Sequence, residues 1–294
     1  MSNYSSTERP AFDMSARVAL VTGGGTGIGL CMATGLARNG AKVYITGRRV
    51  DVLEKAANSI QCSGLGSLVP LQMDVTDEES INKGVQVVTR AEGRLDILIN
   101  NAGATIPSSQ PDFVAKGMEY YSQGKLPYEL ETFEGWSQLF RLNTAAPFFV
   151  TTAFLDLLTK GANTGGRQTS IVINISSIAA SMRTAYPANS LSYGLTKAAV
   201  EQITTFMAAD LARRKIPVRV VALAPGPFPS EILEKLGNIE DLATQAPANH
   251  LSPGPLLRIG LPEEIAMSAN LLVANEYVNG VILTIDGGFK LVNL

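Results

Sequence analysis

A tyrosine and a lysine stand four residues apart, as Tyr193 and Lys197, in the helical pattern SYGLTKAAVEQITTFMAADLAR. Residues at positions i and i+4 share one face of a helix, so we expect the phenol and the amine to meet. An ammonium about 4 Å from a phenol contributes roughly 4 kcal/mol at an effective dielectric of about 20, which lowers a phenol pKa by about three units. The pair therefore predicts an acid–base group at Tyr193, a proton donor in a reduction or an acceptor in an oxidation.

Ser177 and Asn143 are two further polar residues whose surroundings suggest chemistry. Ser177 ends the run INISS, where its hydroxyl could hydrogen-bond an oxygen that gains negative charge. Its neighbour Ser176 should point to the other face by strand alternation. Pro147 follows Asn143 by four residues and has no N–H, so the Asn143 carbonyl loses its usual helical donor. We expect an interrupted helix there; the alternative is a simple proline kink with Asn143 packed against its neighbours.

Seven short, β-branched runs alternate with helical patterns and must position these side chains. The runs cover residues 17–22, 42–46, 67–72, 95–100, 170–176, 218–224 and 280–285. Because the runs are nearly all apolar, both faces of the sheet must be covered, which predicts a doubly wound α/β fold with a seven-stranded parallel sheet. Right-handed crossovers then bring the functional loops together at the carboxyl ends of the strands.

The chain of 294 residues, 46% of them hydrophobic, is long enough for one large core, so we expect a single domain over 17–294. The polar residues 1–16 are expected to form a flexible leader. Two segments break the alternation, 105–134 and 226–260, and both are rich in proline. Loops this long are usually functional covers or disordered insertions, so we expect both to frame a substrate.

Composition excludes several classes of function. A net charge of −2 provides no broad basic face for nucleic acid, and no stretch reaches the roughly 20 apolar residues of a membrane span. The two cysteines, Cys31 and Cys62, are expected to be packing residues of a cytoplasmic protein, with a disulfide as the alternative. His250, the one histidine, has no neighbouring Cys or His cluster, so we expect no metal site.

A glycine-rich turn, TGGGTGIG, follows the first strand and opens a helical pattern that runs to about Asn39. Such glycines let the backbone turn sharply and approach a pyrophosphate, while the helix N-terminus offers free N–H groups to the anion. An ordinary strand-to-helix turn is the alternative. The residues expected at the pyrophosphate are Gly23, Thr26, Gly27, Ile28 and Gly29.

With the motifs that follow it, this turn resembles the short-chain dehydrogenase/reductase family, and in particular its 3-oxoacyl carrier-protein reductase-like members. The motifs are Asp74-Val75, Asn100-Asn-Ala-Gly103, Asn143, Ser177, Tyr193-x-x-x-Lys197 and Pro225-Gly226, in family order between residues 17 and 288. The resemblance implies a Rossmann fold, a nicotinamide dinucleotide and a catalytic set of Asn143, Ser177, Tyr193 and Lys197.

The resemblance also implies roles for individual residues. Lys197 would hold the nicotinamide ribose, and the Asn143 carbonyl would bind a water that relays protons toward Lys197. The interval from Ser177 to Tyr193 is about three residues longer than usual in the family, and Ser192 within it reads as a helix-surface or capping residue. Further dinucleotide contacts are implied for Asp74, Val75, Asn101, Ala102, Gly103, Tyr193, Lys197, Pro225, Gly226 and Ser230, the last standing where relatives usually have Thr.

The second strand ends in Thr46-Gly47-Arg48-Arg49, with no acid at its tip. An acid there would select NAD through the ribose hydroxyls, whereas an Arg accommodates the 2′-phosphate of NADP. We therefore expect NADP(H), with Arg48 as the main phosphate partner and Arg49 as a lesser one; a solvated basic pair is the alternative. Asp51, just beyond, reads as a helix cap rather than a ribose ligand.

The irregular segments carry side chains that would suit an apolar or aromatic carbonyl, although packing of these loops onto the core explains them equally well. They are Phe113, Met118, Tyr120, Tyr121, Tyr128, Tyr186, Phe228, Leu233 and Leu236. The resemblance points to a 3-oxoacyl or polyketide-derived ketone, and to a homo-oligomer, tetramer or dimer, paired through the helices after strands four and five. The alternatives are a biosynthetic cyclase or isomerase, or a dinucleotide-binding regulator without redox turnover.

Overall fold

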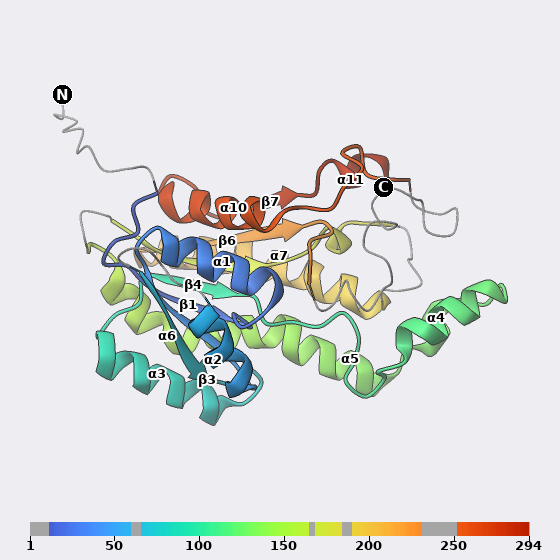
Figure 1. The fold of residues 1–294 in the computed structure, drawn as a ribbon, viewed down its shortest axis with the longest axis horizontal. Helices are drawn as coiled ribbons and strands as arrows, with labels where there is room; N and C mark the ends of the chain where they lie inside the picture. Colours follow the sequence, from blue (N-terminus) through green and yellow to red (C-terminus); the bar gives the residue numbers. More distant parts are fainter. Residues whose placement is uncertain (1–11, 60–65, 165–167, 184–189, 231–251, 294) are drawn as a thin grey trace.

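The computed structural model describes residues 12–59, 66–164, 168–183, 190–230 and 252–293 (Figure 1). Seven strands lie in these ranges: β1 Val18–Thr22, β2 Lys42–Gly47, β3 Ser67–Gln72, β4 Ile97–Asn100, β5 Ser170–Ile175, β6 Val218–Pro225 and β7 Ile282–Ile285. They form one parallel sheet in the order β3-β2-β1-β4-β5-β6-β7. The predicted doubly wound fold is confirmed, and the reversal of strand order beside β1 places a crevice at the carboxyl ends of β1 and β4.

Helices cover both faces of this sheet (Figure 1). Those that pack on it are α1 Gly27–Arg38, α2 Val50–Ser59, α3 Glu78–Glu92, α6 Ala146–Gly161, α7 Leu191–Arg213 and α10 Pro262–Ala274. One apolar cluster joins α1, α2 and α10 to the sheet, and a second joins α3, α6 and α7 to the opposite face. The edge strands β3 and β7 are only partly covered, whereas β1, β4, β5 and β6 are buried throughout.

Shorter elements connect the layers. They are α4 Phe113–Ser122, the 3₁₀ turn η1 Pro127–Leu130, α5 Phe133–Phe140, the π-helical turn η2 Arg141–Ala145, the 3₁₀ turn η3 Ile178–Ala180 and α11 Phe289–Val292. The segment expected to be irregular over 105–134 therefore contains two helical elements and the start of a third. Figure 1 shows α4 extending away from the sheet beyond the carboxyl ends of the strands.

Local sequence explains where several of these elements start and end. Asp77 caps α3 because its side chain accepts hydrogen bonds from Glu79 N and Ser80 N. The same helix ends at Gly93, whose φ of 68° is a left-handed conformation that glycine adopts without strain. Met14 is fully buried and its N–H bonds to the carbonyl of Asn39, so the domain includes this residue and the leader predicted over 1–16 is too long.

The helical run Phe133–Gly161 is long and apolar enough, by length and composition, to cross a membrane. Core helices of globular domains meet the same criterion, and this run also contains charged residues such as Arg141 and Asp156. Half of its apolar window is buried inside the domain. Its buried side chains, such as Val150 and Phe154, pack into the cluster that covers the α3, α6 and α7 face of the sheet, which is the behaviour of a core helix.

Candidate active site

The first turns of α7 bring the predicted acid–base pair together below the end of β5. The hydroxyls of Tyr193 and Ser177 are hydrogen-bonded to each other. Lys197 Nζ lies 5.8 Å from the centroid of the Tyr193 ring and donates a 2.8 Å hydrogen bond to the Ile175 carbonyl. The prediction that phenol and amine meet on one helix face is confirmed, although the amine lies over the ring.

Burial dominates the electrostatics of this pair. Burial raises the pKa of Tyr193 above its ordinary value, while the hydrogen bond with Ser177 acts in the opposite direction. Burial also lowers the pKa of Lys197, to about 8. The expected net lowering of the phenol pKa is therefore wrong, because the argument from charge alone left out the cost of burying a phenolate. At neutral pH Tyr193 is a protonated donor beside a lysine close to its titration range.

Asn143 lies in the π-helical turn η2, which separates α5 from α6. The predicted interruption of the helix is confirmed, and its form is one wide turn in which the Ala146 N–H bonds to the Arg141 carbonyl. The Asn143 amide is buried; it accepts a 2.9 Å hydrogen bond from Ala104 N and donates to Ala104 O (2.8 Å) and Thr196 Oγ1 (3.0 Å). The side chain thereby joins the loop after β4 to the helix that carries Tyr193.

The glycines let the turn pack more closely against the loop after β4 than any side chain would allow. A Cβ at Gly29 would lie 2.4 Å from both Asn101 Nδ2 and the Gly23 carbonyl, and a Cβ at Gly23 would lie 3.1 Å from Ala102 Cα. The N-cap of α1, Thr26, makes no side-chain capping hydrogen bond, and no acidic residue occupies the first turn. The N-terminus of α1 is thus electropositive and uncapped, which fits the pyrophosphate of a dinucleotide.

The loop after β4 is fixed to this turn. Asn101 Nδ2 donates to the carbonyls of Thr22 (2.9 Å) and Gly23 (3.1 Å), and the Thr22 hydroxyl accepts from Asn101 N and Ala102 N. A Cβ at Gly103 would lie 3.1 Å from Asn143 Oδ1 and 3.5 Å from Lys197 Nζ. The residues predicted to contact the dinucleotide after β4 therefore lie between the glycine-rich turn and the reacting pair.

The ends of β2 and β3 form the other wall of the crevice. Arg48 and Arg49 follow β2 and are exposed. Partial burial opposes ionisation of Asp74, but hydrogen bonds from Thr76 and the charges of Arg48 and Arg141 outweigh it and lower the pKa of Asp74. The carboxylate is thus held ionised beside Arg48.

Comparison with known proteins identifies the family. The model of the family described as short chain dehydrogenase matches residues 17–241. The chain belongs to the short-chain dehydrogenase/reductase family. It is 33% identical to the short-chain dehydrogenase/reductase VdtF of Byssochlamys spectabilis, over 96% of this chain and 95% of that protein. It is 32% identical to the rhamnolipids biosynthesis 3-oxoacyl-[acyl-carrier-protein] reductase of Pseudomonas aeruginosa, over 96% and 99% of the two chains.

Solved structures of this short-chain dehydrogenase fold carry both forms of the nicotinamide. The Pseudomonas aeruginosa RhlG/NADP active-site complex superposes with a TM-score of 0.79 at 29% identity, covering 96% of this chain and 99% of that one. A 7α-hydroxysteroid dehydrogenase complexed with NADH and 7-oxo glycochenodeoxycholic acid has a TM-score of 0.77 at 25% identity, covering 96% and 98% of the two chains. As a member of this family, the chain is an oxidoreductase whose Rossmann fold binds a nicotinamide dinucleotide.

Some residues of this short-chain dehydrogenase differ from their predicted positions. Ser192, predicted at the helix surface or as a cap, is fully buried, and its hydroxyl donates a 2.7 Å hydrogen bond to Glu131 Oε2. The cap of α7 is instead Ser190, which accepts from Tyr193 N. Asp51 lies inside the first turn of α2 rather than at its cap. The hydroxyl of Ser176 donates to Glu201.

Two residues of the site lie inside the predicted motifs but were not among the residues predicted to act there. Thr196 is buried between Asn143 and Tyr193, where its hydroxyl accepts from the Asn143 amide and donates to the Tyr193 carbonyl. In the sequence, Thr196 could have been recognised by its position directly before Lys197. Thr22, the last residue of β1, joins the two loops of the crevice through three hydrogen bonds; its place before the first glycine was the signal there.

Of the side chains expected to line the substrate space, Phe113 and Phe228 are buried in the packing, whereas Met118 and Tyr128 are exposed. Their contact with a substrate stays a prediction, as it does for Tyr120. For Tyr121 the structure describes the backbone alone. Tyr186, Leu233, Leu236 and His250 lie outside the described residues, as does Cys62. Cys31, in α1, is partly buried and packs against the apolar cluster on that face of the sheet. Burial raises the pKa of its thiol, and the charge of Glu263 raises it further.

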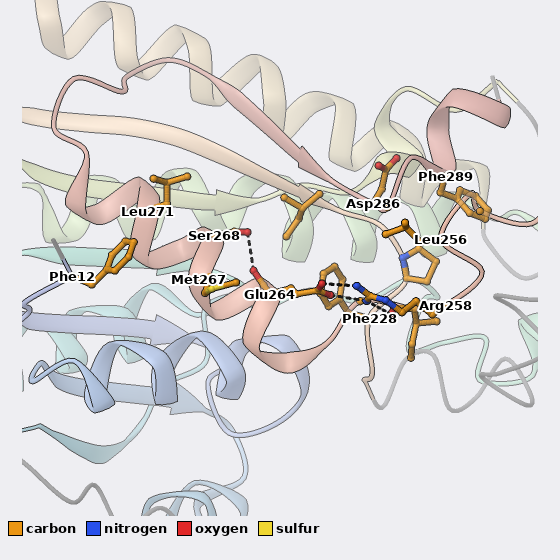
Figure 2. Close-up of a pocket in the computed structure, with 16 residues that line it drawn as sticks. Phe12, Phe228, Leu256, Arg258, Glu264, Met267, Ser268, Leu271, Asp286 and Phe289 are labelled. Carbon is orange, nitrogen blue, oxygen red and sulfur yellow. Dashed lines mark hydrogen bonds and ion pairs between the residues drawn. The ribbon is translucent and has the colours of Figure 1, made fainter.

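A cavity of about 410 Å³ lies away from the reacting pair, between α10 and the turn after β7 (Figure 2). Figure 2 shows Met267 and Leu271 on one side of it, with Phe228 and the Arg258–Glu264 ion pair near its other end. None of the described catalytic candidates lines this cavity. We therefore assign the chemistry to the crevice at β1, β4 and β5, not to this space.

Proposed function

We propose that this chain is an NADP(H)-dependent oxidoreductase that reduces a ketone, or oxidises the corresponding alcohol, in an apolar, 3-oxoacyl or polyketide-like substrate. One observation carries the proposal: the Tyr193 hydroxyl is hydrogen-bonded to Ser177, and the buried Lys197 amine lies over the Tyr193 ring. This arrangement provides a neutral proton donor beside a second hydroxyl, which is what reduction of a carbonyl requires.

In this proposal a bound nicotinamide supplies the hydride, and the protein manages the proton. Ser177 donates a hydrogen bond to the substrate oxygen as negative charge develops on it, and Tyr193 gives that oxygen its proton. Lys197, charged at neutral pH and held by the Ile175 carbonyl, stabilises the phenolate that forms. Asn143 fixes the loop and the helix on either side of this pair through its amide.

The crevice provides the dinucleotide with donors along its length. We assign the pyrophosphate to the uncapped N-terminus of α1, the adenosine end to the ends of β2 and β3, and the nicotinamide end to β4, α7 and the start of the segment after β6. The assigned contacts are Gly23, Thr26, Gly27, Ile28, Gly29, Arg48, Arg49, Asp74, Val75, Asn101, Ala102, Gly103, Tyr193, Lys197, Pro225, Gly226 and Ser230.

We expect Arg48→Ala to raise the KM for NADPH by roughly 10- to 100-fold, since a charge-assisted contact to a phosphate is lost. The KM for NADH should hardly change, because NADH has no 2′-phosphate. Steady-state kinetics with both nucleotides measure the ratio. Arg90→Ala, an exposed arginine at the end of α3, is the matched control. An equal loss with NADPH and NADH would remove Arg48 from this role.

The substrate class is supported by a relative named as a 3-oxoacyl reductase, whereas a relative named as a gluconate 5-dehydrogenase makes a sugar acid the competing class. The test is a panel of 3-oxoacyl thioesters, polyketide-like aromatic ketones, steroid ketones and sugar ketones with NADPH, followed at the nicotinamide absorbance band. We expect turnover with the apolar ketones and little with the sugars. Tight NADPH binding without oxidation by any carbonyl would favour a cyclase, isomerase or regulator instead.

Short-chain dehydrogenases are often oligomeric, and we propose that this chain forms a dimer or tetramer through α6 and α7. Exposed aromatic side chains support this: Phe149 on α6 is 50% exposed and Phe206 on α7 is 65% exposed. Light scattering should give a mass of two or four times 31.2 kDa, and Phe206→Glu should lower it. A cytoplasmic location, also proposed, would suit the free thiol of Cys31.

A further inference from the structure

Both ends of the protruding segment 105–131 are bonded to the first turn of α7. At one end, the Ser190 hydroxyl donates a 3.0 Å hydrogen bond to the Thr105 carbonyl. At the other, the Ser192 hydroxyl donates a 2.7 Å hydrogen bond to Glu131 Oε2, and the Ser192 N–H donates a weaker one, 3.4 Å long, to Glu131 Oε1. The turn that carries Tyr193 is therefore held from outside its own helix.

Glu131 acts on α7 as a second N-terminal cap. Ser192 is the second residue of this helix, and its N–H has no partner within the helix, as for all first-turn N–H groups. The cap residue, Ser190, accepts a hydrogen bond from the Tyr193 N–H, and Glu131 accepts one from the Ser192 N–H, which Ser190 does not bind. A carboxylate is the favoured group there, because the N-terminus of a helix is electropositive and hydrogen bonds to an ionised acceptor are strong.

The residue after Glu131 caps the other helix of the site. Thr132 Oγ1 accepts a 3.0 Å hydrogen bond from Gly135 N at the start of α5, the helix that continues into the turn of Asn143. Gln110 holds this dipeptide in place: its amide donates a 2.8 Å hydrogen bond to the Leu130 carbonyl and accepts one from the Thr132 hydroxyl. Two consecutive residues thus fix the start of α7, which carries Tyr193 and Lys197, and the start of α5, which leads into the turn of Asn143.

We propose that Glu131 is a positioning residue, which sets the orientation of Tyr193 by holding the first turn of α7 through Ser192. The inference rests on the proposed role of Tyr193 as proton donor. Because Ser192 is fully buried and directly precedes Tyr193, a displacement of this turn moves the phenol. A displacement of about 1 Å at a reacting group can lower a rate by roughly 100-fold.

The test compares Glu131→Ala, Glu131→Gln, Ser192→Ala and the double variant Glu131→Ala/Ser192→Ala. We expect Glu131→Ala to lower kcat with an apolar ketone by roughly 10- to 100-fold, with the Kd for NADPH unchanged. Glu131→Gln should recover most of kcat, because its amide oxygen still accepts from Ser192. The double variant should be no slower than the slower single variant. Glu134→Gln is the matched control, because Glu134 is exposed and accepts a hydrogen bond from Gln138 within α5.

Hydrogen–deuterium exchange of the amides at 191–194 separates this inference from the proposed function. Glu131→Ala should speed exchange there and leave α10 unchanged. Unchanged exchange would overturn the inference, and so would faster exchange with an unaltered kcat, or additive losses in the double variant. Should the wild-type protein reduce no ketone of the panel, the proposed function fails, and the exchange comparison alone then decides whether Glu131 holds this turn.

Discussion

Replacing Tyr193 by phenylalanine is expected to lower kcat by roughly 100- to 10,000-fold, because the substitution removes the proton donor and keeps the ring. Because the pKa of Tyr193 is raised, its hydroxyl is fully protonated at neutral pH and can give a proton to the substrate. Phenylalanine has no proton to give. Affinity for NADPH should change by less than about threefold, since we assign the pyrophosphate and the adenosine to other parts of the crevice.

The measurement is a single-turnover reduction of the best ketone, with NADPH binding followed separately by fluorescence. Tyr277→Phe is the matched control, because that side chain is fully exposed on the surface. Single-turnover rates within tenfold of wild type for Tyr193→Phe would mean that another group, or solvent, delivers the proton.

Lys197→Met is expected to have opposite effects on activity and on stability. The turnover should fall by roughly 100- to 1,000-fold, because the buried ammonium no longer stabilises the charge that develops on Tyr193. The folded protein, however, should become more stable at neutral pH. Burial lowers the pKa of Lys197 from 10.5 to about 8, which corresponds to roughly 3 kcal/mol of destabilisation when the amine is charged. The lost hydrogen bond to Ile175 offsets about 1 kcal/mol of the gain.

The size of this stability difference changes with pH. Below pH 8 both the folded and the unfolded chain hold the proton, so the wild type bears the whole cost of a buried charge. Between pH 8 and 10.5 the folded chain releases the proton first, and wild-type stability rises relative to that of Lys197→Met. Urea denaturation at pH 7 and at pH 9.5 should therefore show a stabilised variant at the lower pH and a smaller difference at the higher one.

Lys160→Met serves as the control for both measurements. Its amine is exposed and paired with Asp156 on the surface of α6, so neither activity nor the pH dependence of stability should change. If Lys197→Met were less stable than the wild type at pH 7, or if the stability difference did not vary with pH, Lys197 would not be a destabilising buried charge.

The sheet could be predicted from sequence because its signal is local. A run such as RVALVT must be covered on both faces, and alternation with helices leaves few topologies for such runs. The edge strand β3, with polar and half-exposed positions, was found by the same rule although it is not buried. The true start of the domain was missed, because the single apolar residue Met14 gives no periodic pattern.

The reacting pair could be predicted because an i, i+4 spacing fixes a geometry, whereas its electrostatics could not. The pKa of Tyr193 depends on how deeply the hydroxyl is buried, and burial is set by segments far away in the sequence. The same limit applies to Ser192 and Glu131, which lie 61 residues apart and meet only in the fold. No spacing rule connects two residues at such a distance along the chain.

The wide turn at Asn143 also determines which neighbours α5 and α6 pack against. One additional residue in a helical turn rotates everything beyond it by roughly 100° about the axis. The apolar stripes on the two sides of the turn therefore face different neighbours: α5 lies against α7, whereas α6 lies against α3, β4 and β5. One continuous helical run thus packs in two different directions, and Asn143 lies at the turn where the direction changes.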